Sequence, residues 1–208
     1  MSRVPECERL DRLCEPDRAF WGRDGIMLAG MDEVGRGPLA GPVVACCAAM
    51  PETPLIEHVN DSKKVTGKRR EALYPVLADT ARGFSLGWVG PDMIDEMNIL
   101  QATKLAFQKA FEAMPIPVTD VLVDALQNLR ISARQHPIVH GDALSYSIAC
   151  ASILAKVERD RYMIKQDALY PQYGFAKNKG YGTAEHIAAL KKYGPCPIHR
   201  RSFIGSFL

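Results

Sequence analysis

The chain has 208 residues, of which 47% are hydrophobic and 24% are charged, a composition typical of a globular protein that buries one substantial core. Its formal net charge of +2 excludes a uniformly basic chain, so any nucleic-acid-binding surface must be a local patch. Residues 177–208 are a candidate patch because they carry six lysines and arginines against one acid, although a solvated tail explains the same charges.

The six cysteines form no Cys-x-x-Cys pair and no zinc-type spacing with histidine, which favours small buried side chains in a reducing compartment. The N-terminus mixes charges and lacks the apolar core of a signal peptide. The longest uncharged stretch, Gly37–Pro51, is too short and too rich in proline and glycine to cross a bilayer. We therefore expect a cytoplasmic protein that does not enter a membrane.

In chain order, residues 1–25 are a charged and mixed extension, helical or loose, and residues 26–208 form one domain. Apolar runs bounded by turn residues predict strands at 26–34, 43–50, 84–89, 120–124 and 137–140. Helices are predicted with Thr66 as N-cap, from Pro91, and over 100–114, 144–168 and 184–193.

Three strands come first, and helices then alternate with two more strands. This order favours an α/β fold with a mixed five-stranded sheet flanked by helices. The last helix and the tail behind it, about residues 183–208, form a small C-terminal helical region within the domain.

Residues 28–37 combine two kinds of chemistry. Asp32 and Glu33 end an apolar run, where a buried strand provides a rigid support for a carboxylate. Gly35 and Gly37 then let main-chain N–H groups approach a ligand closely, and Arg36 adds a forked donor suited to phosphate. Acids that can hold a metal thus lie beside groups that can hold a phosphate, which indicates metal-assisted phosphodiester chemistry.

Two other acids lie at the carboxyl ends of predicted strands: Asp124 is the last residue of the strand 120–124, and Asp142 follows the strand 137–140. Ligands in open sheets gather at the carboxyl ends of strands, so these acids and the pair at 32–33 can converge. Four carboxylates brought together repel one another unless divalent cations neutralise them, and oxygen ligands select Mg²⁺ or Mn²⁺. Two such ions about 3.5–4 Å apart can activate a water and stabilise a leaving oxygen.

Some alternatives stay open for these acids. Adjacent strand residues point to opposite faces, so either the strand ends or bulges at Glu33, or one of Asp32 and Glu33 acts through water. Taken alone, Asp142 is better explained as the start of the long helix, and Asp124 equally well as the start of a turn. The joint occurrence of acids at three strand ends is what favours a metal site.

Residues 32–43, Asp-Glu-Val-Gly-Arg-Gly-Pro-Leu-Ala-Gly-Pro-Val, resemble the signature of ribonuclease HII, the bacterial type 2 ribonuclease H. The resemblance continues, in the family's order, through motifs at 61–64, 98–103, 151–160, 179–183 and 199–203. It covers about Ile26 to Phe203, and such joint agreement is very specific.

This resemblance implies an RNase H-like fold and a metal-dependent nuclease that hydrolyses the RNA strand of RNA–DNA hybrids. It also implies incision 5′ of a single ribonucleotide in duplex DNA, which leaves a 3′-hydroxyl and a 5′-phosphate. By the same resemblance, the catalytic and metal-binding carboxylates are Asp32, Glu33, Asp124 and Asp142, with Mn²⁺ or Mg²⁺ in a two-metal site.

The family's Gly-Arg-Gly loop, which reads the 2′-hydroxyl and the neighbouring phosphate, corresponds to residues 35–37, and its substrate-sensing tyrosine corresponds to Tyr181. Two positions depart from the usual pattern, Ala125 where many members have glycine and His140 where many have lysine. Neither removes a carboxylate, so the departures bear on local positioning, metal preference or rate.

Four further residues are candidate substrate contacts: Lys63, Ser152, Lys156 and Arg200. Solvated surface is the alternative for Lys63, and helix packing is the alternative for Ser152, which lies four residues before Lys156 on one helical face. Arg200 belongs to a basic tail segment that is a candidate clamp on the nucleic-acid backbone, and such a clamp makes affinity sensitive to salt.

The sequence therefore predicts a monomeric nuclease whose partners are RNA–DNA hybrid and ribonucleotide-containing duplex DNA. A DNA nuclease of resolvase or transposase type shares the fold, but the Gly-Arg-Gly loop and Tyr181 argue against it. A catalytically silent hybrid-binding module is a second alternative, against which the four acids argue. A P-loop phosphotransferase is disfavoured because no Gly-Lys-Ser/Thr follows a glycine loop.

Overall fold

The computed structural model describes residues 5–208; residues 1–4 lie outside the described part. The strands are β1 (Leu28–Val34), β2 (Val43–Ala49), β3 (Gly83–Val89), β4 (Asp120–Asp124) and β5 (Arg134–Ile138). The helices are α1 (Glu6–Leu13), α2 (Glu15–Arg18), α3 (Gly67–Thr80), α4 (Pro91–Met97), α5 (Ile99–Glu112), α6 (Gly141–Leu144), α7 (Tyr146–Leu169), α8 (Phe175–Asn178), α9 (Ala184–Tyr193) and α10 (Arg201–Ile204), with a 3-10 turn at Pro171–Tyr173.

The strands form one mixed five-stranded sheet in the order β3-β2-β1-β4-β5, which confirms the predicted fold class. Strands β1, β2 and β3 pair antiparallel, whereas β1, β4 and β5 pair parallel. The carboxyl ends of the three parallel strands therefore meet at one edge of the sheet. The strand ends that carry acids are brought to the same place by this topology.

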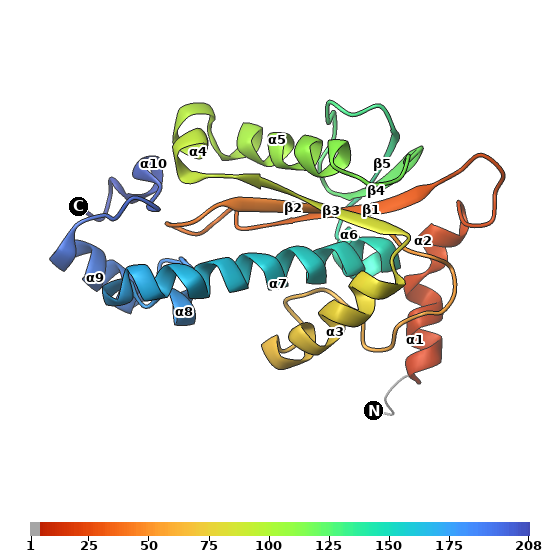
Figure 1. Cartoon of the computed structure of the whole chain (residues 1–208), viewed down its shortest axis with the longest axis horizontal. Coiled ribbons are helices and arrows are strands. Elements are labelled where there is room, and N and C mark those ends of the chain that lie inside the picture. The colour runs from red at the N-terminus through yellow and green to blue at the C-terminus, as the bar shows by residue number, and fades with distance from the viewer. Residues whose placement is uncertain (1–4) are drawn as a thin grey trace.

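Helices cover both faces of the sheet, α4 and α5 on one and α7 with α3 on the other (Figure 1). Two glycines allow the helix backbones to touch the strands. A Cβ at Gly30 of β1 would lie 2.1 Å from the backbone carbon of Ser147, and one at Gly87 of β3 would lie 1.9 Å from the carbonyl oxygen of Ala106. Because both faces are covered, every residue of β2 is buried.

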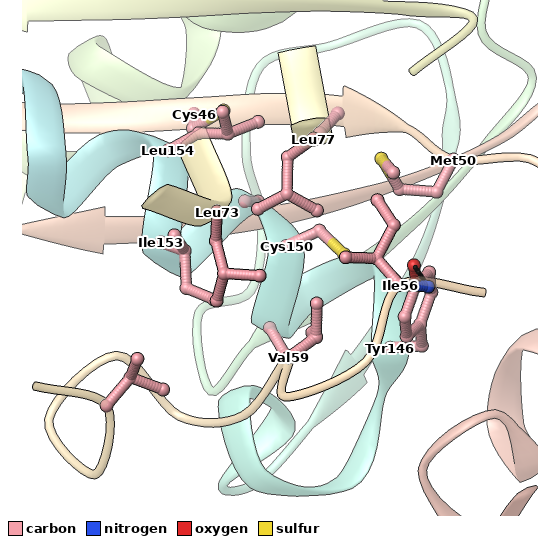
Figure 2. Packing of buried hydrophobic residues seen from close by; sticks show 14 of the residues in the cluster. Cys46, Met50, Ile56, Val59, Leu73, Leu77, Tyr146, Cys150, Ile153 and Leu154 are labelled. Carbon is pink, nitrogen blue, oxygen red and sulfur yellow. Dashed lines mark hydrogen bonds between the residues drawn. The ribbon is translucent and has the colours of Figure 1, made fainter. Parts of the chain in front are cut away.

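The apolar side chains beneath the α7 face form the core that Figure 2 shows, with Leu73 and Leu77 of α3 lying beside Ile153 and Leu154 of α7. Tyr146, at the start of α7, packs in this core and also makes a polar contact. Its hydroxyl accepts a hydrogen bond from the N–H of Ile56 at 2.9 Å. Helix α3 and the loop before it are thereby fixed against α7.

Local signals predicted several element boundaries correctly. The Thr66 hydroxyl accepts from the N–H of Arg69 at the start of α3, and α4 begins at Pro91 as expected. The predicted helix over 184–193 is α9, capped by the hydroxyl of Thr183. These features depend on residues within one turn of each helix, which is why the sequence carries them.

Two predicted elements were misplaced. The strand predicted at 137–140 is β5, which runs from Arg134 to Ile138; it is an edge strand, and Arg134 and His136 both bind the Asp120 carboxylate, at 2.8–2.9 Å, so it needs no apolar run. The long helix predicted from 144 begins at Tyr146, because extended Ser145 separates it from the short α6.

Within the N-terminal extension, α1 and α2 are followed by turns, and the extension packs onto the core with Leu10, Leu13 and Cys14 buried. Its fully buried Asp17 carboxylate accepts hydrogen bonds from the N–H groups of Tyr146, at 3.1 Å, and Ser147, at 2.9 Å. The first amides of α7 have no partner within the helix, so Asp17 supplies it from 129 positions away.

Among residues 5–208, no helix is long and apolar enough to cross a membrane.

Replacing Asp17 with alanine should lower the free energy of unfolding by about 3 kcal/mol, because two buried N–H groups lose their acceptor. Urea denaturation measures this. The control is Asp11→Ala, whose exposed carboxylate pairs with Arg18 and should contribute less than about 0.5 kcal/mol. Equal effects of the two substitutions would contradict the capping role of Asp17.

Candidate active site

A cavity of about 230 Å³ opens at the sheet edge where β1 ends. It brings together most of the predicted site residues: Asp32, Glu33, Gly35, Arg36, Gly37, Lys63, Ser152, Lys156 and Tyr181. Asp124 and Asp142 are not lining residues, but the Lys63 ammonium group lies 3.4 Å from Asp142 Oδ2 and so connects that acid to the cavity. Arg200 lies elsewhere.

Asp32 and Glu33 reach the same cavity although β1 continues regularly through both. Asp32 pairs with Cys46 and Glu33 with Ala45, so the strand end or bulge that sequence reasoning offered at Glu33 is absent. The Asp32 Oδ1 atom accepts a hydrogen bond from the N–H of Glu33 at 2.8 Å. Of the alternatives, action of one of the two acids through water stays a prediction.

The carboxyl groups of Asp32 and Glu33 both lie where burial makes the ionised form unfavourable. Asp32 is only 5% exposed, and burial raises its pKa well above the usual range; the nearby Glu33 and Asp124 carboxylates add to this rise. Burial also raises the pKa of Glu33, against the opposing effect of Arg36, whose Nη1 lies 3.3 Å from Glu33 Oε1. The buried Oε2 of Glu33 has no hydrogen-bond partner among residues 5–208.

Asp124 ends β4, and its Oδ1 accepts a hydrogen bond from the N–H of Gly141 at 2.8 Å. This bond ties the end of β4 to the start of α6, which carries Asp142. Ala125, directly after Asp124, and His140, two residues before Asp142, both have left-handed backbones, with φ of 51° and 59°. The two departures from the family pattern therefore lie at the turns that aim these acids.

The interpretation favoured for Asp142 taken alone, that it caps the long helix, is wrong. Ser145 is the cap, because its hydroxyl accepts a hydrogen bond from the N–H of Ile148. Burial raises the pKa of Asp142, the carboxylate of Asp61 adds to the rise, and Lys63 opposes it. Asp61 is a buried acid inside the motif at 61–64 that carries part of the family resemblance. Sequence reasoning chose Lys63 from this motif and gave Asp61 no role at the site.

The donor set fits a hard divalent cation. Among residues 5–208, no three acidic, histidine or cysteine side chains converge closely enough to ligate one ion as they stand. However, three carboxyl groups have raised pKa values, and Glu33 Oε2 is buried without a partner. Carboxylates destabilised by burial and mutual repulsion gain most when a cation draws them together.

The Gly-Arg-Gly loop leaves β1 with a left-handed turn at Gly35, where φ is 94° and a Cβ would lie 2.3 Å from Arg159 Nε. Arg36 and Gly37 are exposed. Ser152 donates to the hydroxyl of Ser62 at 2.8 Å, so it serves packing as well as lining the cavity. Lys156 is paired with Asp160 at 2.6 Å.

The prediction that Arg200 contacts substrate is wrong for its side chain, which is completely buried. Its guanidinium donates to the carbonyl oxygens of Gly35, Arg36 and Gly41, and so binds the loop from inside. A buried cation cannot clamp a nucleic-acid backbone. The charge pattern of the tail suggested exposure because charge alone does not show which arginines are satisfied internally.

Tyr181 is 42% exposed at the cavity, with Lys156 Nζ 5.9 Å from the centre of its ring. Its carbonyl oxygen accepts a hydrogen bond from Nδ1 of the buried His186, at 2.9 Å. The other nitrogen of His186 lies 3.0 Å from Nε2 of His199, and burial lowers the pKa of both histidines. Two neutral histidines thus fix the backbone behind Tyr181, a role that sequence reasoning missed.

An RNase H-like sheet with carboxylates gathered beside a phosphate-suited loop defines a metal-dependent nuclease. The profile of the family described as Ribonuclease HII matches residues 29–206, and the chain belongs to this family. It is therefore an endonuclease that cleaves the RNA of RNA–DNA hybrids and acts in ribonucleotide excision. The expectations of fold and activity drawn from the sequence are confirmed.

Two relatives called Ribonuclease HII illustrate the match. The protein of Desulfitobacterium hafniense (strain DSM 10664 / DCB-2) is 49% identical over 202 residues, which are 97% of this chain and 78% of that protein. The protein of Caldicellulosiruptor bescii is 50% identical over 203 residues, which cover 95% of this chain and 98% of that protein.

Solved structures agree with the fold. The ribonuclease H2 of Pyrococcus horikoshii OT3 superposes with a TM-score of 0.69 at 31% identity, covering 84% of this chain and 92% of that one. The RNase HII of Archaeoglobus fulgidus, in complex with PCNA, gives a TM-score of 0.72 at 23% identity, covering 87% and 96%. Bst-RNase HIII in complex with Mn²⁺ gives 0.63 at 16% identity, covering 93% and 68%. The last two show the fold alone.

Replacing Ala125 with glycine should raise the free energy of unfolding by about 0.5–1 kcal/mol, because the left-handed backbone strains any residue with a Cβ. The control is Ala188→Gly on the exposed face of α9, where glycine should lower it by about 1 kcal/mol. Urea denaturation of both variants compares the two signs, and destabilisation at both positions would contradict strain at Ala125.

Proposed function

We propose that Asp32, Glu33, Asp124 and Asp142 hold two divalent cations, Mg²⁺ or Mn²⁺, for this nuclease. The observation that carries the proposal is one cavity lined both by Asp32 and Glu33 and by the Gly-Arg-Gly loop and Tyr181. Bound there, such ions supply activation of a water and stabilisation of the leaving oxygen. The Mn²⁺ complex of the distant Bst-RNase HIII supports manganese as one of the metals.

The residues of the chain would share the work as follows. Buried Asp32 gives a rigidly placed carboxylate, and the Gly141 N–H holds Asp124 in a fixed orientation. Lys63 neutralises Asp142 in the absence of a cation, and its side chain is 81% exposed, so it can turn to a substrate phosphate once a cation replaces it. Water attacks directly, and no side chain forms a covalent intermediate.

Recognition of the ribonucleotide would fall to the loop and to Tyr181. A 2′-hydroxyl is the group that distinguishes RNA from DNA, and Gly35 and Gly37 give main-chain groups close access to it. The Arg36 guanidinium is half exposed and only loosely paired with Glu33, so it can reach the adjacent phosphate. The ring of Tyr181, open on its exposed side, can stack on a sugar or base.

The partners that this arrangement fits are RNA–DNA hybrid and duplex DNA with embedded ribonucleotides, cut on the 5′ side of the ribonucleotide. We further propose that the chain acts as a monomer in the cytoplasm, where its free thiols, five of them buried, stay reduced.

Asp124→Asn should lower kcat by at least about 100-fold, because a lost carboxylate ligand removes several kcal/mol of transition-state stabilisation. The fold should persist, since the amide oxygen can still accept from Gly141. Steady-state cleavage in Mn²⁺ and urea denaturation measure the two effects. The matched control is Asp79→Asn at an exposed position of α3, and an Asp124 variant as active as this control would remove Asp124 from the site.

Arg36→Ala should reduce by about tenfold the preference in binding for a single-ribonucleotide duplex over an all-DNA duplex, because one charge-assisted contact near the junction is lost. The measurement is the ratio of the two dissociation constants in EDTA, where neither duplex is cut. Arg82→Ala, at an exposed position on the approach to β3, is the control. An unchanged ratio in Arg36→Ala would exclude Arg36 from recognition.

A further inference from the structure

Two fully buried arginines, Arg159 of α7 and Arg200 of the tail, lie behind the Gly-Arg-Gly loop and the residues that follow it. Arg159 donates to the carbonyl oxygens of Pro42 at 2.9 Å, Ala40 at 3.1 Å and Lys179 at 2.9 Å. Arg200 donates to those of Gly41, Arg36 and Gly35 at 2.9, 2.9 and 2.5 Å. Six carbonyls are thus satisfied by two side chains.

Neither guanidinium has a carboxylate partner within 4.0 Å among residues 5–208. Burial, together with the repulsion of the nearby Arg159, lowers the pKa of Arg200 to about 9. A buried charge without a counter-charge is costly, so packing alone does not explain two of them. The burial of these two arginines is explained if the loop needs hydrogen-bond donors for its carbonyl oxygens and also a positive electrostatic potential.

The bonds to Arg200 also determine where the loop's N–H groups point. In a planar trans peptide the C=O and N–H bonds point in opposite directions. The carbonyls of Gly35 and Arg36 point inward to Arg200, so the N–H groups of Arg36 and Gly37 must point outward. These two N–H groups have no partner among the described residues, and both residues are exposed and line the cavity.

We propose that Arg200, supported by Arg159, is a positioning residue that aims the N–H groups of Arg36 and Gly37 at the phosphate and 2′-oxygen beside the scissile bond. The two guanidinium groups add a positive potential behind these donors, which favours an anionic phosphate. Arg159 binds Lys179, two residues before Tyr181, as well as Ala40 and Pro42, so the segment that follows the loop and the segment that precedes the tyrosine share one anchor.

This inference rests on the proposed recognition role of the loop and adds what orients it. Lysine at position 200 keeps the charge but loses the planar fork that spans several carbonyls. A hydrogen bond to a charged group contributes about 1.5–3 kcal/mol, so misaligning one donor costs about tenfold or more in affinity for the ribonucleotide-containing duplex.

The test is equilibrium binding in EDTA, where no cleavage occurs, of two fluorescent duplexes that differ only by one ribonucleotide. The ratio of their dissociation constants is measured for wild type, Arg200→Lys, Arg159→Lys and the control Arg161→Lys, a half-buried neighbour on α7 that pairs with Glu71. We expect Arg200→Lys to reduce the ratio at least tenfold, Arg159→Lys to reduce it less, and the control to leave it unchanged.

A purely structural role would lower the free energy of unfolding of Arg200→Lys and leave the ratio intact, which would overturn the inference. A wild-type ratio of one would instead overturn the recognition role of the loop itself. The two outcomes are distinguishable because the first is seen in the Arg200→Lys variant and the second in the wild-type protein.

A second measurement needs no variant and so does not depend on how Arg200→Lys folds. In ¹⁵N-labelled wild type, the amide signals of Arg36 and Gly37 should shift on addition of the ribonucleotide duplex in EDTA, and shift less with the all-DNA duplex. If these two signals stay in place while the duplex binds selectively, their N–H groups are not the donors and the proposal is wrong.

Discussion

The site depends on carboxylates that are buried next to one another at the carboxyl ends of parallel strands. Pairing of Met31 with Val123 places the following residues, Asp32 and Asp124, side by side on β1 and β4. Close packing of α7 on Gly30 leaves little room for water around Asp32. The charged state is therefore unfavourable in the protein alone, and a cation is the natural means of stabilising it.

The Gly-Arg-Gly loop beside these acids has polar backbone groups that need partners. Its carbonyls must be satisfied without covering the face that meets substrate, and buried Arg200 does this from behind, while Arg159 binds the carbonyls of Ala40 and Pro42 just after the loop. A negative cluster and a positively supported loop therefore share one cavity. Such a pairing suits a phosphodiester. Its negative charge is stabilised by cations near the scissile bond and by hydrogen-bond donors to its oxygens.

The sequence contained the features that depend on neighbouring residues. The Asp32-Glu33 pair, the left-handed turn at Gly35 and the Thr66 cap were all predictable because each involves a few consecutive positions. Features that depend on distant contacts were not. Arg200 binds Gly35 across 165 positions and was predicted to contact substrate, since its charge, not its partners, is visible in the sequence.

The position of a strand within the sheet also determines whether its residues need to be apolar. β5 is an edge strand whose polar residues bind Asp120, so its apolar content did not reveal its bounds. The division between α6 and α7 depends on the extended backbone of Ser145 and on Asp17, which caps α7 from the N-terminal segment. Neither signal could be assigned before the packing of that segment was known.

The most direct test of a metal-dependent, junction-reading nuclease is cleavage of an end-labelled duplex with one ribonucleotide, beside an all-DNA control, in Mg²⁺, in Mn²⁺ and in EDTA. We expect a single cut on the 5′ side of the ribonucleotide, supported by either metal, abolished by EDTA and absent from the control. Cleavage of the all-DNA duplex would contradict recognition of the ribonucleotide, and a cut that persists in EDTA would contradict the metal site.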